Sequence, residues 1–288
     1  MRTRGWSHWL YLAPALLVLG SYLVYPTLVT LYLSFFDARS AQYIGLQNYA
    51  RIFTQEETLI ALRNNLLWII VVPALTVSLG LLMAVVFDRV RHEALAKSAI
   101  FLPMAISFVG AGVIWKFVYA YTPPIYPQIG ILNAIRTALG FDPIGWLIRS
   151  PWVNNLALMA VFIWIWAGYC MIILSAAYKG IHRDLLDAAR TDGANEWEIF
   201  WHVALPMLRP TILVVATTMT VFTLKVFDII YVLTNGNFGT EVLADRMYKE
   251  MFHFHNFGAA SAIAVIILLA MLPVIVINVR RFYAKEGR

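Results

Sequence analysis

Six long apolar runs dominate this chain of 288 residues, and they decide what it can fold into. A helix needs roughly 20 apolar residues to cross the hydrocarbon core of a bilayer. The runs cover residues of about 10–35, 65–87, 98–121, 153–178, 210–233 and 257–279. Because 61% of the residues are hydrophobic and only 13% are charged, the chain cannot cover a surface that faces water. The sequence therefore predicts an all-α integral membrane protein with six transmembrane helices.

Lys and Arg predict which side of the membrane each loop faces, because cytoplasmic loops carry an excess of both. With both termini inside, thirteen Lys and Arg lie on the inner side and seven on the outer side. The inner residues are Arg2, Arg4, Arg89, Arg91, Lys97, Lys179, Arg183, Arg190, Arg209, Arg280, Arg281, Lys285 and Arg288. The outer residues are Arg39, Arg51, Arg63, Arg136, Arg149, Arg246 and Lys249. We therefore expect a multi-pass protein of the cytoplasmic (inner) membrane whose N- and C-termini are cytoplasmic.

The first apolar run follows MRTRG, as the apolar core of a signal peptide would. It is too long for such a core, and no small-residue cleavage site follows it. We interpret it as a retained first span. The net charge of +6 comes largely from residues at the ends of the apolar runs, so a membrane explains it and a nucleic-acid partner is not predicted.

A polar insert, DAARTDGANEWEIFWHVALPMLRP, occupies residues 187–210 on the predicted inner side. Asp184 is expected to cap a short first helix that runs through LLDAAR. Gly193 then breaks or turns that helix. Ala188, Ala189 and Gly193 leave a flat surface of small residues that another protein could approach closely.

The second half of the insert is predicted to be another helix. Asn195 and Glu198, three residues apart, are typical of a capping box at a helix start. Pro206 and Pro210 are expected to end this helix and to begin the next span. Its large apolar face must pack on the spans, on the lipid interface or on a partner, and it is made of Trp197, Phe200 and Trp201.

The spacing of the insert resembles the EAA loop of ABC importer permeases. Asp187, Ala188 and Ala189 are followed after three residues by Gly193, and after nine more by VALP. The first acid is Asp187 where the family has Glu, a side chain shorter by one methylene. In that family the loop is a coupling helix that docks into a cleft of a cytosolic ATPase. The resemblance implies that the ATPase-coupling residues are Asp187, Ala188, Ala189, Asp192, Gly193, Ala194, Leu205 and Pro206.

The resemblance extends over nearly the whole chain. YLAPALLVLGSYLVYPTLVTLYLSFFD, IGLQNYARIF and AKSAIFLPMAISFVGAGVIWKFVY are similar to the first span, the following GLxNY segment and the third span of MalF-like carbohydrate-uptake permeases. The fifth span, the outer loop and the sixth span of these permeases are resembled by KVFDIIYVLTNGNFGTEVLADRMYKEMF followed by NFGAASAIAVIILL. NFGT, in place of a Gly-Gly-Pro turn, resembles the α-glucoside permeases.

This resemblance implies a type I ABC importer permease that moves a carbohydrate by alternating access. It implies one permease domain over residues 1–288, with the coupling loop at about 180–209 between spans four and five. The implied partners are a second homologous permease subunit, two ATP-binding cassette subunits and an extracytoplasmic sugar-binding protein. The chain would bind no cofactor itself, since ATP and Mg²⁺ would bind the partner ATPase.

Charged residues inside the fifth run predict a substrate path. Lys225 and Asp228 are three residues apart, so on one helix they would share a face and could pair. Charges are costly in lipid, so these two should face the bundle interior or an aqueous cavity, or form a structural ion pair. Hydroxyl, amide and aromatic side chains nearby suit a neutral sugar. The candidate path residues are Thr220, Thr223, Lys225, Asp228, Tyr231 and Asn235.

No catalytic constellation is present in the sequence, which has neither a GxxxxGK[ST] loop for ATP phosphates nor an HExxH motif. The chain is therefore not expected to be an enzyme. His253 and His255 in MFHFHNF lack an acid or a Cys at ligand spacing, so no metal site is predicted. The alternatives are an ion-coupled secondary transporter, which would need intramembrane acids along several spans, and a membrane-embedded enzyme.

Overall fold

The computed structural model describes residues 6–88, 90–149 and 152–286. The prediction of membrane orientation used several Lys and Arg residues that the structure does not describe, or whose side chains it does not describe. They are Arg2, Arg4, Arg89, Arg281, Lys285 and Arg288. The described residues form helices and no strand, with one isolated bridge between Phe36 and Tyr43. Among them, five helices are long and apolar enough to cross a membrane, and a bent helix pair adds a sixth candidate. The predicted all-α membrane fold is confirmed.

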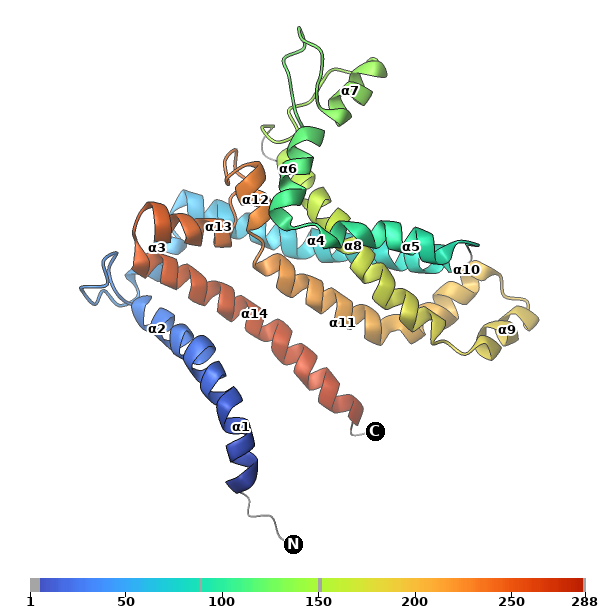
Figure 1. Cartoon of the computed structure of the whole chain (residues 1–288), viewed down its shortest axis with the longest axis horizontal. Coiled ribbons are helices and arrows are strands. Elements are labelled where there is room, and N and C mark those ends of the chain that lie inside the picture. The colour runs from blue at the N-terminus through green and yellow to red at the C-terminus, as the bar shows by residue number, and fades with distance from the viewer. Residues whose placement is uncertain (1–5, 89, 150–151, 287–288) are drawn as a thin grey trace. The chain divides into compact units, whose positions relative to one another are not determined.

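Contacts divide the chain into two units, so the single permease domain stays a prediction. The first unit comprises residues 1–59 and 246–269. Its first span is one continuous helix in Figure 1, made of α1 (Trp6–Leu19), the π-helical turn η1 (Gly20–Val24) and α2 (Tyr25–Leu33). The short helix α3 (Gln47–Ile52) follows.

The GLxNY segment organises the loop of this first unit. The Asn48 amide donates to the carbonyl oxygens of Ser34 at 2.9 Å and Phe36 at 2.7 Å. The Tyr49 hydroxyl donates to Ser34 Oγ at 2.7 Å. Because Asn48 is almost fully buried, these bonds satisfy backbone groups that water does not reach. The motif therefore has a structural role in holding the loop after the first span.

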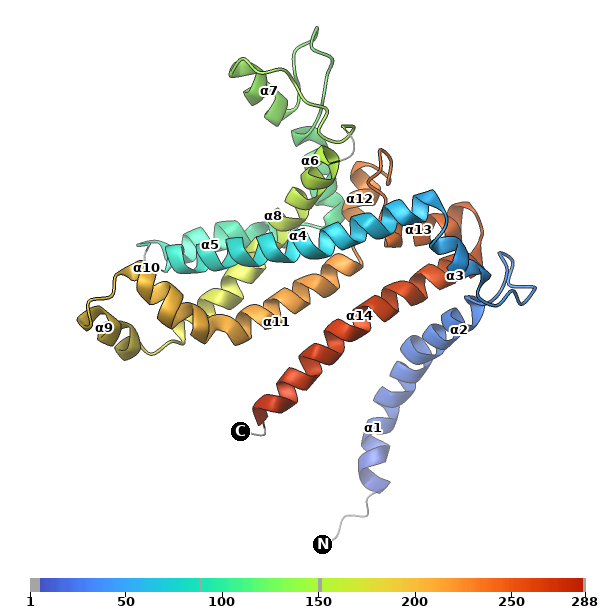
Figure 2. The ribbon, with the colours of Figure 1, turned by 180° about the vertical axis from the view of Figure 1, so that it is seen from behind.

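The second unit comprises residues 60–245 and 270–288. Its helices are α5 (Glu93–Phe101), η2 (Leu102–Ala105), α6 (Phe108–Val118), α7 (Ile131–Ala138), α8 (Val153–Lys179), α9 (Arg183–Thr191), α10 (Glu196–Ile199), η3 (Phe200–Ala204), α11 (Leu205–Leu224) and α12 (Asp228–Leu233). The unit boundary falls within α4 (Glu56–Phe87), α13 (Leu243–Tyr248) and α14 (Phe257–Glu286), while η4 (Lys249–His253) lies in the first unit. Figures 1 and 2 show α9 and α10 at one end of α8 and α11, and α7 and α12 at the other.

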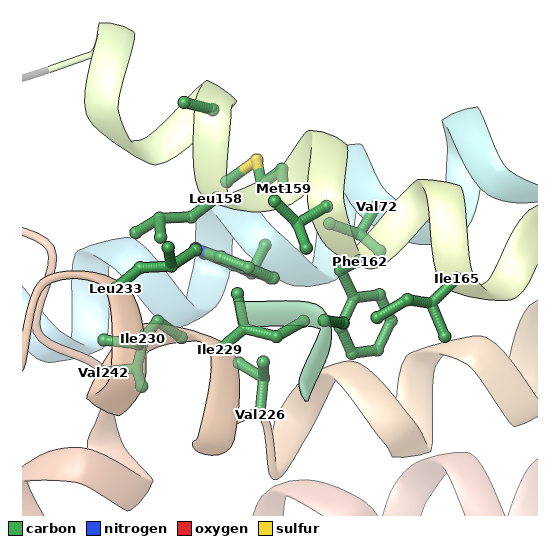
Figure 3. Close-up of a cluster of buried hydrophobic side chains, with 14 of the residues drawn as sticks. Val72, Leu158, Met159, Phe162, Ile165, Val226, Ile229, Ile230, Leu233 and Val242 are labelled. Atoms are coloured by element: carbon green, nitrogen blue, oxygen red, sulfur yellow. The ribbon is translucent and has the colours of Figure 1, made fainter. Parts of the chain in front are cut away.

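The helix α8 forms the centre of the second unit. Figure 3 shows its side chains, among them Leu158 and Phe162, facing Val72 of α4 and Ile229 of α12. The Phe162 ring meets Trp68 edge to face, with centroids 5.9 Å apart. Because α8 is apolar around its whole circumference, it must be enclosed by neighbouring helices or by lipid.

The third predicted span is not one straight helix, and this part of the prediction was wrong. The helix pair Glu93–Ala105 and Phe108–Val118 is bent by 102°. Pro103 lacks the N–H that a continuing helix needs, and Ile106 adopts extended backbone geometry. The Ser107 hydroxyl then accepts from the N–H of Gly110 at 3.1 Å and starts α6 as an N-cap.

Candidate functional site

The insert between α8 and α11 begins with the short exposed helix α9. Its N-cap is His182, whose side chain makes no capping bond. The prediction that Asp184 caps this helix was wrong. Asp184 lies in the first turn instead, where a carboxylate interacts favourably with the positive end of the helix dipole. Asp187 and Ala188 are exposed, and Ala189 is half-buried.

Gly193 ends α9 with a Schellman motif. Its φ is +88°, the left-handed conformation that glycine adopts most readily. The N–H of Gly193 donates to the Arg190 carbonyl at 3.0 Å, and the N–H of Ala194 donates to the Ala189 carbonyl at 3.0 Å. These are the two bonds of that motif, so the predicted glycine turn is confirmed. Asp192, the C-cap residue, lies exposed beside it.

The second helix of the insert starts with the predicted capping box. The Asn195 side chain accepts from the N–H groups of Trp197 and Glu198, both at 3.0 Å. The Glu198 carboxylate accepts from the N–H of Asn195 at 2.8 Å, so the box is reciprocal. This second helix predicted for the insert is therefore confirmed.

The two prolines do not end that helix, and the prediction that they do was wrong. The segments α10, η3 and α11 form one continuous helix, Glu196–Leu224, of 29 residues. Pro206, next to the half-buried Leu205, lies in the first turn of α11, and Pro210 lies inside it. In a regular α-helix the ring of Pro206 would clash with the carbonyl of His202, four residues before it. His202 belongs to the wider π-helical turn η3, which makes room for the ring, so the helix continues.

Arg190 connects the two helices of the insert. Its Nη1 lies 2.6 Å from Asp187 Oδ1, and its Nε lies 3.0 Å from Glu196 Oε1. The hydrogen bonds to Glu196 and Asp187 raise the pKa of Arg190 above its ordinary value, so the guanidinium stays charged. All three side chains are about half exposed, so the pairs orient the helices more than they stabilise them.

The insert also exposes an aromatic cluster. Trp197 is 70% exposed and Trp201 is 47% exposed. The rings pack on one another, with centroids of Trp197 and Trp201 5.6 Å apart and those of Phe200 and Trp201 5.4 Å apart. The insert therefore presents polar α9 and an apolar aromatic surface next to each other, a combination suited to a protein partner.

A cavity of about 360 Å³ lies within the second unit, at the break between α11 and α12. The break spans Lys225–Phe227, and its backbone is not helical. The lining residues are Phe108, Phe162, Trp166, Phe222, Lys225, Val226, Phe227, Asp228 and Ile229. Aromatic faces with a few polar groups are typical of a small-molecule site, and a sugar offers apolar ring faces and hydroxyls to both.

Lys225 and Asp228 both line this cavity, but not from one helix face as predicted. The helix ends at Leu224 and restarts at Asp228, so the spacing rule for helices does not apply. Among the described residues no ion pair joins Lys225 to Asp228. The Lys225 ammonium lies over the Phe222 ring, 5.5 Å from its centroid.

The other candidate path residues do not line the cavity. The hydroxyls of Thr220 and Thr223 donate to the carbonyls of Ala216 at 2.9 Å and Met219 at 2.7 Å, within their own helix. The Tyr231 ring stacks on Phe227, with centroids 5.1 Å apart. Asn235 is exposed in a turn, with a φ of +50°.

The aromatic residues of the lining are not among the candidate path residues predicted from the sequence. The Trp166 ring lies 4.6 Å from Phe222 and 6.1 Å from Phe108, centroid to centroid. Its indole N–H is buried and has no hydrogen-bond acceptor among the described residues. A buried donor without a partner is costly.

Asn65 of α4 holds the break in place. Its amide donates to the Leu224 carbonyl at 3.3 Å, the last of α11, and its oxygen accepts from the N–H of Leu243 at 2.7 Å. The neighbouring Asn64 donates to the carbonyls of Gly239 and Glu241, each at 2.8 Å. Buried amides of α4 thus fix both the break and the turn that follows α12.

A charged cluster ties the helices together next to the insert. Glu93 of α5 accepts from Lys97 of its own helix, and its Oε1 lies 2.7 Å from Lys179 Nζ at the end of α8. Lys97 also donates to Ser175 of α8. Since α8 leads directly into the insert, this cluster fixes the base from which α9 projects.

The fold defines a helical protein with several candidate membrane spans and an exposed helix–turn–helix insert between two of them. Residues 76–283 match the model of the binding-protein-dependent transport system inner membrane component family, and the chain belongs to this family. It is thus a multi-pass permease of a family of ABC transport components, which is a transport family and not an enzyme family.

Curated relatives cover nearly the whole chain. It is 60% identical over 277 residues to the osmoprotective compounds uptake permease protein GgtC of Synechocystis sp., covering 96% of this chain and 99% of that protein. It is 46% identical over 280 residues to the alpha-glucoside transport system permease protein AglF of Rhizobium meliloti, covering 97% and 83%.

A solved structure shares the fold. A chain of a bacterial ABC transporter involved in the import of the acidic polysaccharide alginate matches with a TM-score of 0.80 and 22% identity, covering 96% of each chain. The same kind of transporter in complex with an alginate pentasaccharide-bound periplasmic protein matches with a TM-score of 0.82 and 22% identity, covering 95% of this chain and 92% of that one. At this identity the likeness concerns the fold alone.

Proposed function

We propose that the chain is one permease subunit of an ATP-driven importer that carries a carbohydrate, an α-glucoside or a glucoside-like osmoprotectant, across the inner membrane. The exposed insert carries this proposal, because its Schellman turn and capping box fix the direction of α9 relative to α10 while Asp187 and Ala188 stay exposed. The names of the two curated relatives support the substrate class.

In this mechanism the insert transmits motion to the spans. ATP and Mg²⁺ bind to two partner ATPase subunits, which close and displace the residues from Asp187 to Ala194. Leu205 and Pro206, at the start of α11, connect this displacement to the spans, which switch from inward-facing to outward-facing. A second permease subunit completes the path, and the outer loop after Thr234 meets an extracytoplasmic sugar-binding protein. Both termini of the chain are then cytoplasmic.

The insert is tested by recovering the chain from its native membrane in mild detergent and identifying the co-purifying proteins by mass. We expect an ATPase and a second permease. Ala188→Trp, on the exposed face of α9, should lose the ATPase and keep the permease. Ala138→Trp, also at an exposed position, on α7 at the other end of α8, is the matched control and should keep both. A wild-type chain recovered alone, or an Ala188→Trp chain that keeps its ATPase, contradicts the proposal.

The cavity is tested by uptake of a radiolabelled α-glucoside. A lost hydrogen bond to a charged group costs about 1.5–3 kcal/mol, so Asp228→Ala should lower uptake about 10- to 100-fold while membrane levels of the chain are unchanged. Thr220→Val is the control, because that hydroxyl bonds its own helix, and it should transport normally. If uptake and membrane level fall together in Asp228→Ala, Asp228 is structural and does not line the path.

A further inference from the structure

The loop between α6 and α8 turns a polar side chain inward and apolar side chains outward. Asn133 of α7 is completely buried. Its amide donates to the carbonyls of Ala120 at 3.0 Å and Ile144 at 2.9 Å. Its oxygen accepts from the N–H of Ile144 at 2.9 Å and from the indole N–H of Trp146 at 3.2 Å. One side chain thus joins both ends of the loop to α7, and the loop is a built structure rather than a loose connection.

The outer face of α7 is apolar. Ile131, Ile135 and Leu139 are 56%, 55% and 69% exposed, and their spacing of four residues places them in one stripe along the helix. The same loop exposes four more apolar side chains, those of Ile125, Tyr126, Ile129 and Phe141. Burying a side chain of this size gains about 1.5–3 kcal/mol, so the stripe on α7 gains from an apolar partner.

The hydrogen bonds fix how deep α7 lies relative to the spans. The Tyr119 hydroxyl at the end of α6 donates to the Ala157 carbonyl at 2.9 Å, one turn inside α8. Ala120, the next residue, accepts from Asn133 of α7. At Gly130 a Cβ atom would lie 2.1 Å from the Ala120 carbonyl oxygen, so the two backbones touch. The helix α7 is therefore held at the first turn of α8.

That first turn lies at the edge of the bilayer. With 27 residues α8 is about 40 Å long, longer than a hydrocarbon core of about 30 Å, so its ends reach the headgroups. The helix α6 exposes Val113, Ile114 and Phe117, the last of them 70% exposed, as a span in contact with lipid would. The chain continues from this surface directly into the exposed residues of the loop.

We propose that α7 lies along the membrane surface, with the stripe Ile131, Ile135 and Leu139 inserted at the boundary of headgroups and acyl chains. Arg136, whose guanidinium lies 5.3 Å from the centroid of the Phe141 ring, sits at the edge of the stripe, within reach of lipid phosphates. The leaflet is the one opposite the coupling insert, because α7 and α9 lie at opposite ends of α8 (Figures 1 and 2). If the insert is cytoplasmic, as the proposed function has it, this is the outer leaflet. Only that assignment rests on the proposed function.

The test measures the depth of single cysteines. Ile135→Cys is labelled with an NBD maleimide in the full chain, in vesicles of phosphatidylethanolamine and phosphatidylglycerol. Cys170 is completely buried and does not compete for the label. Quenching by phospholipid with a nitroxide near the headgroup is compared with quenching by aqueous iodide. The control is Asp142→Cys, an exposed charged position three residues after Leu139 that should face water.

We expect lipid nitroxide to quench position 135 about threefold more than position 142, and iodide to show the reverse order. Ile131→Cys, one turn away on the stripe, should match position 135 and guards against a misfolded variant. Equal access of iodide to positions 135 and 142 overturns the proposal. Protection of position 135 only after an extracytoplasmic binding protein is added also overturns it and makes the stripe a docking surface. The depth measurement needs neither transport nor a partner, so its failure is distinct from failure of the proposed function.

Discussion

Gly193→Val should abolish uptake of a radiolabelled α-glucoside while the chain still reaches the membrane. Gly193 has a φ of +88°, and a left-handed residue with a Cβ costs about 1–2 kcal/mol, more when it is β-branched. No atom lies within 4 Å of the position a Cβ would take, so the effect is conformational and not a clash. The Schellman bonds should open, and α9 should lose its fixed direction relative to α10. We expect a loss of at least about tenfold in uptake per chain, since roughly 1.4 kcal/mol corresponds to a factor of ten.

Gly193→Asn is the matched control, because Asn tolerates the left-handed conformation better than any β-branched residue. It adds a side chain of similar size to Val in the same open space, and it should keep most of the uptake. Equal loss in the two variants would mean that bulk at this position matters and not the turn. Normal uptake with Val would remove the turn from the mechanism.

Asn65→Leu is expected to lower the stability of the chain in detergent more than any exposed substitution. The two side chains have similar volume, but Leu cannot accept from the N–H of Leu243 or donate to the Leu224 carbonyl. Leaving a buried polar group without a partner costs about 1–3 kcal/mol, so the free energy of unfolding should fall by about 2–4 kcal/mol. The midpoint of thermal unfolding should drop on the order of 5–10 °C.

Asn237→Leu is the control for this variant. Asn237 is exposed in the turn after α12, and its replacement should shift the midpoint by no more than about 2 °C. Both variants are followed as the fraction of monodisperse chain that remains after heating. A midpoint for Asn65→Leu equal to that of the control would show that the amide does not hold the break.

The parts of the fold that depend on neighbours in sequence were predicted well. The apolar runs gave the spans because a bilayer sets the length of a spanning helix. The turn at Gly193 and the capping box at Asn195 followed from residues within four positions of each other. Asp184 is not the cap because the helix starts at Arg183, two residues earlier than expected, and helix ends are the least certain part of such predictions.

The parts that depend on distant contacts could not be predicted. Nothing near Lys225 in sequence breaks the helix there, and the carbonyl released at Leu224 is satisfied by Asn65, 159 positions away. The aromatic lining of the cavity could not be predicted for the same reason, because Phe108, Trp166 and Phe222 come from three different helices. Pro206 was expected to end a helix because the rule for prolines assumes a regular α-helix, and η3 is not one.

The continuous helix Glu196–Leu224 is about 43 Å long for its 29 residues, with Trp197 near one end and the cavity break at the other. Its ladder of hydrogen bonds is interrupted near the insert, because Pro206 and Pro210 have no N–H and η3 is a π-helical turn. From Thr211 to Leu224 the helix contains no further proline and is its stiffer part. A movement of the insert would therefore reach Lys225 through a single helix that has one place to bend, close to the insert and far from the cavity.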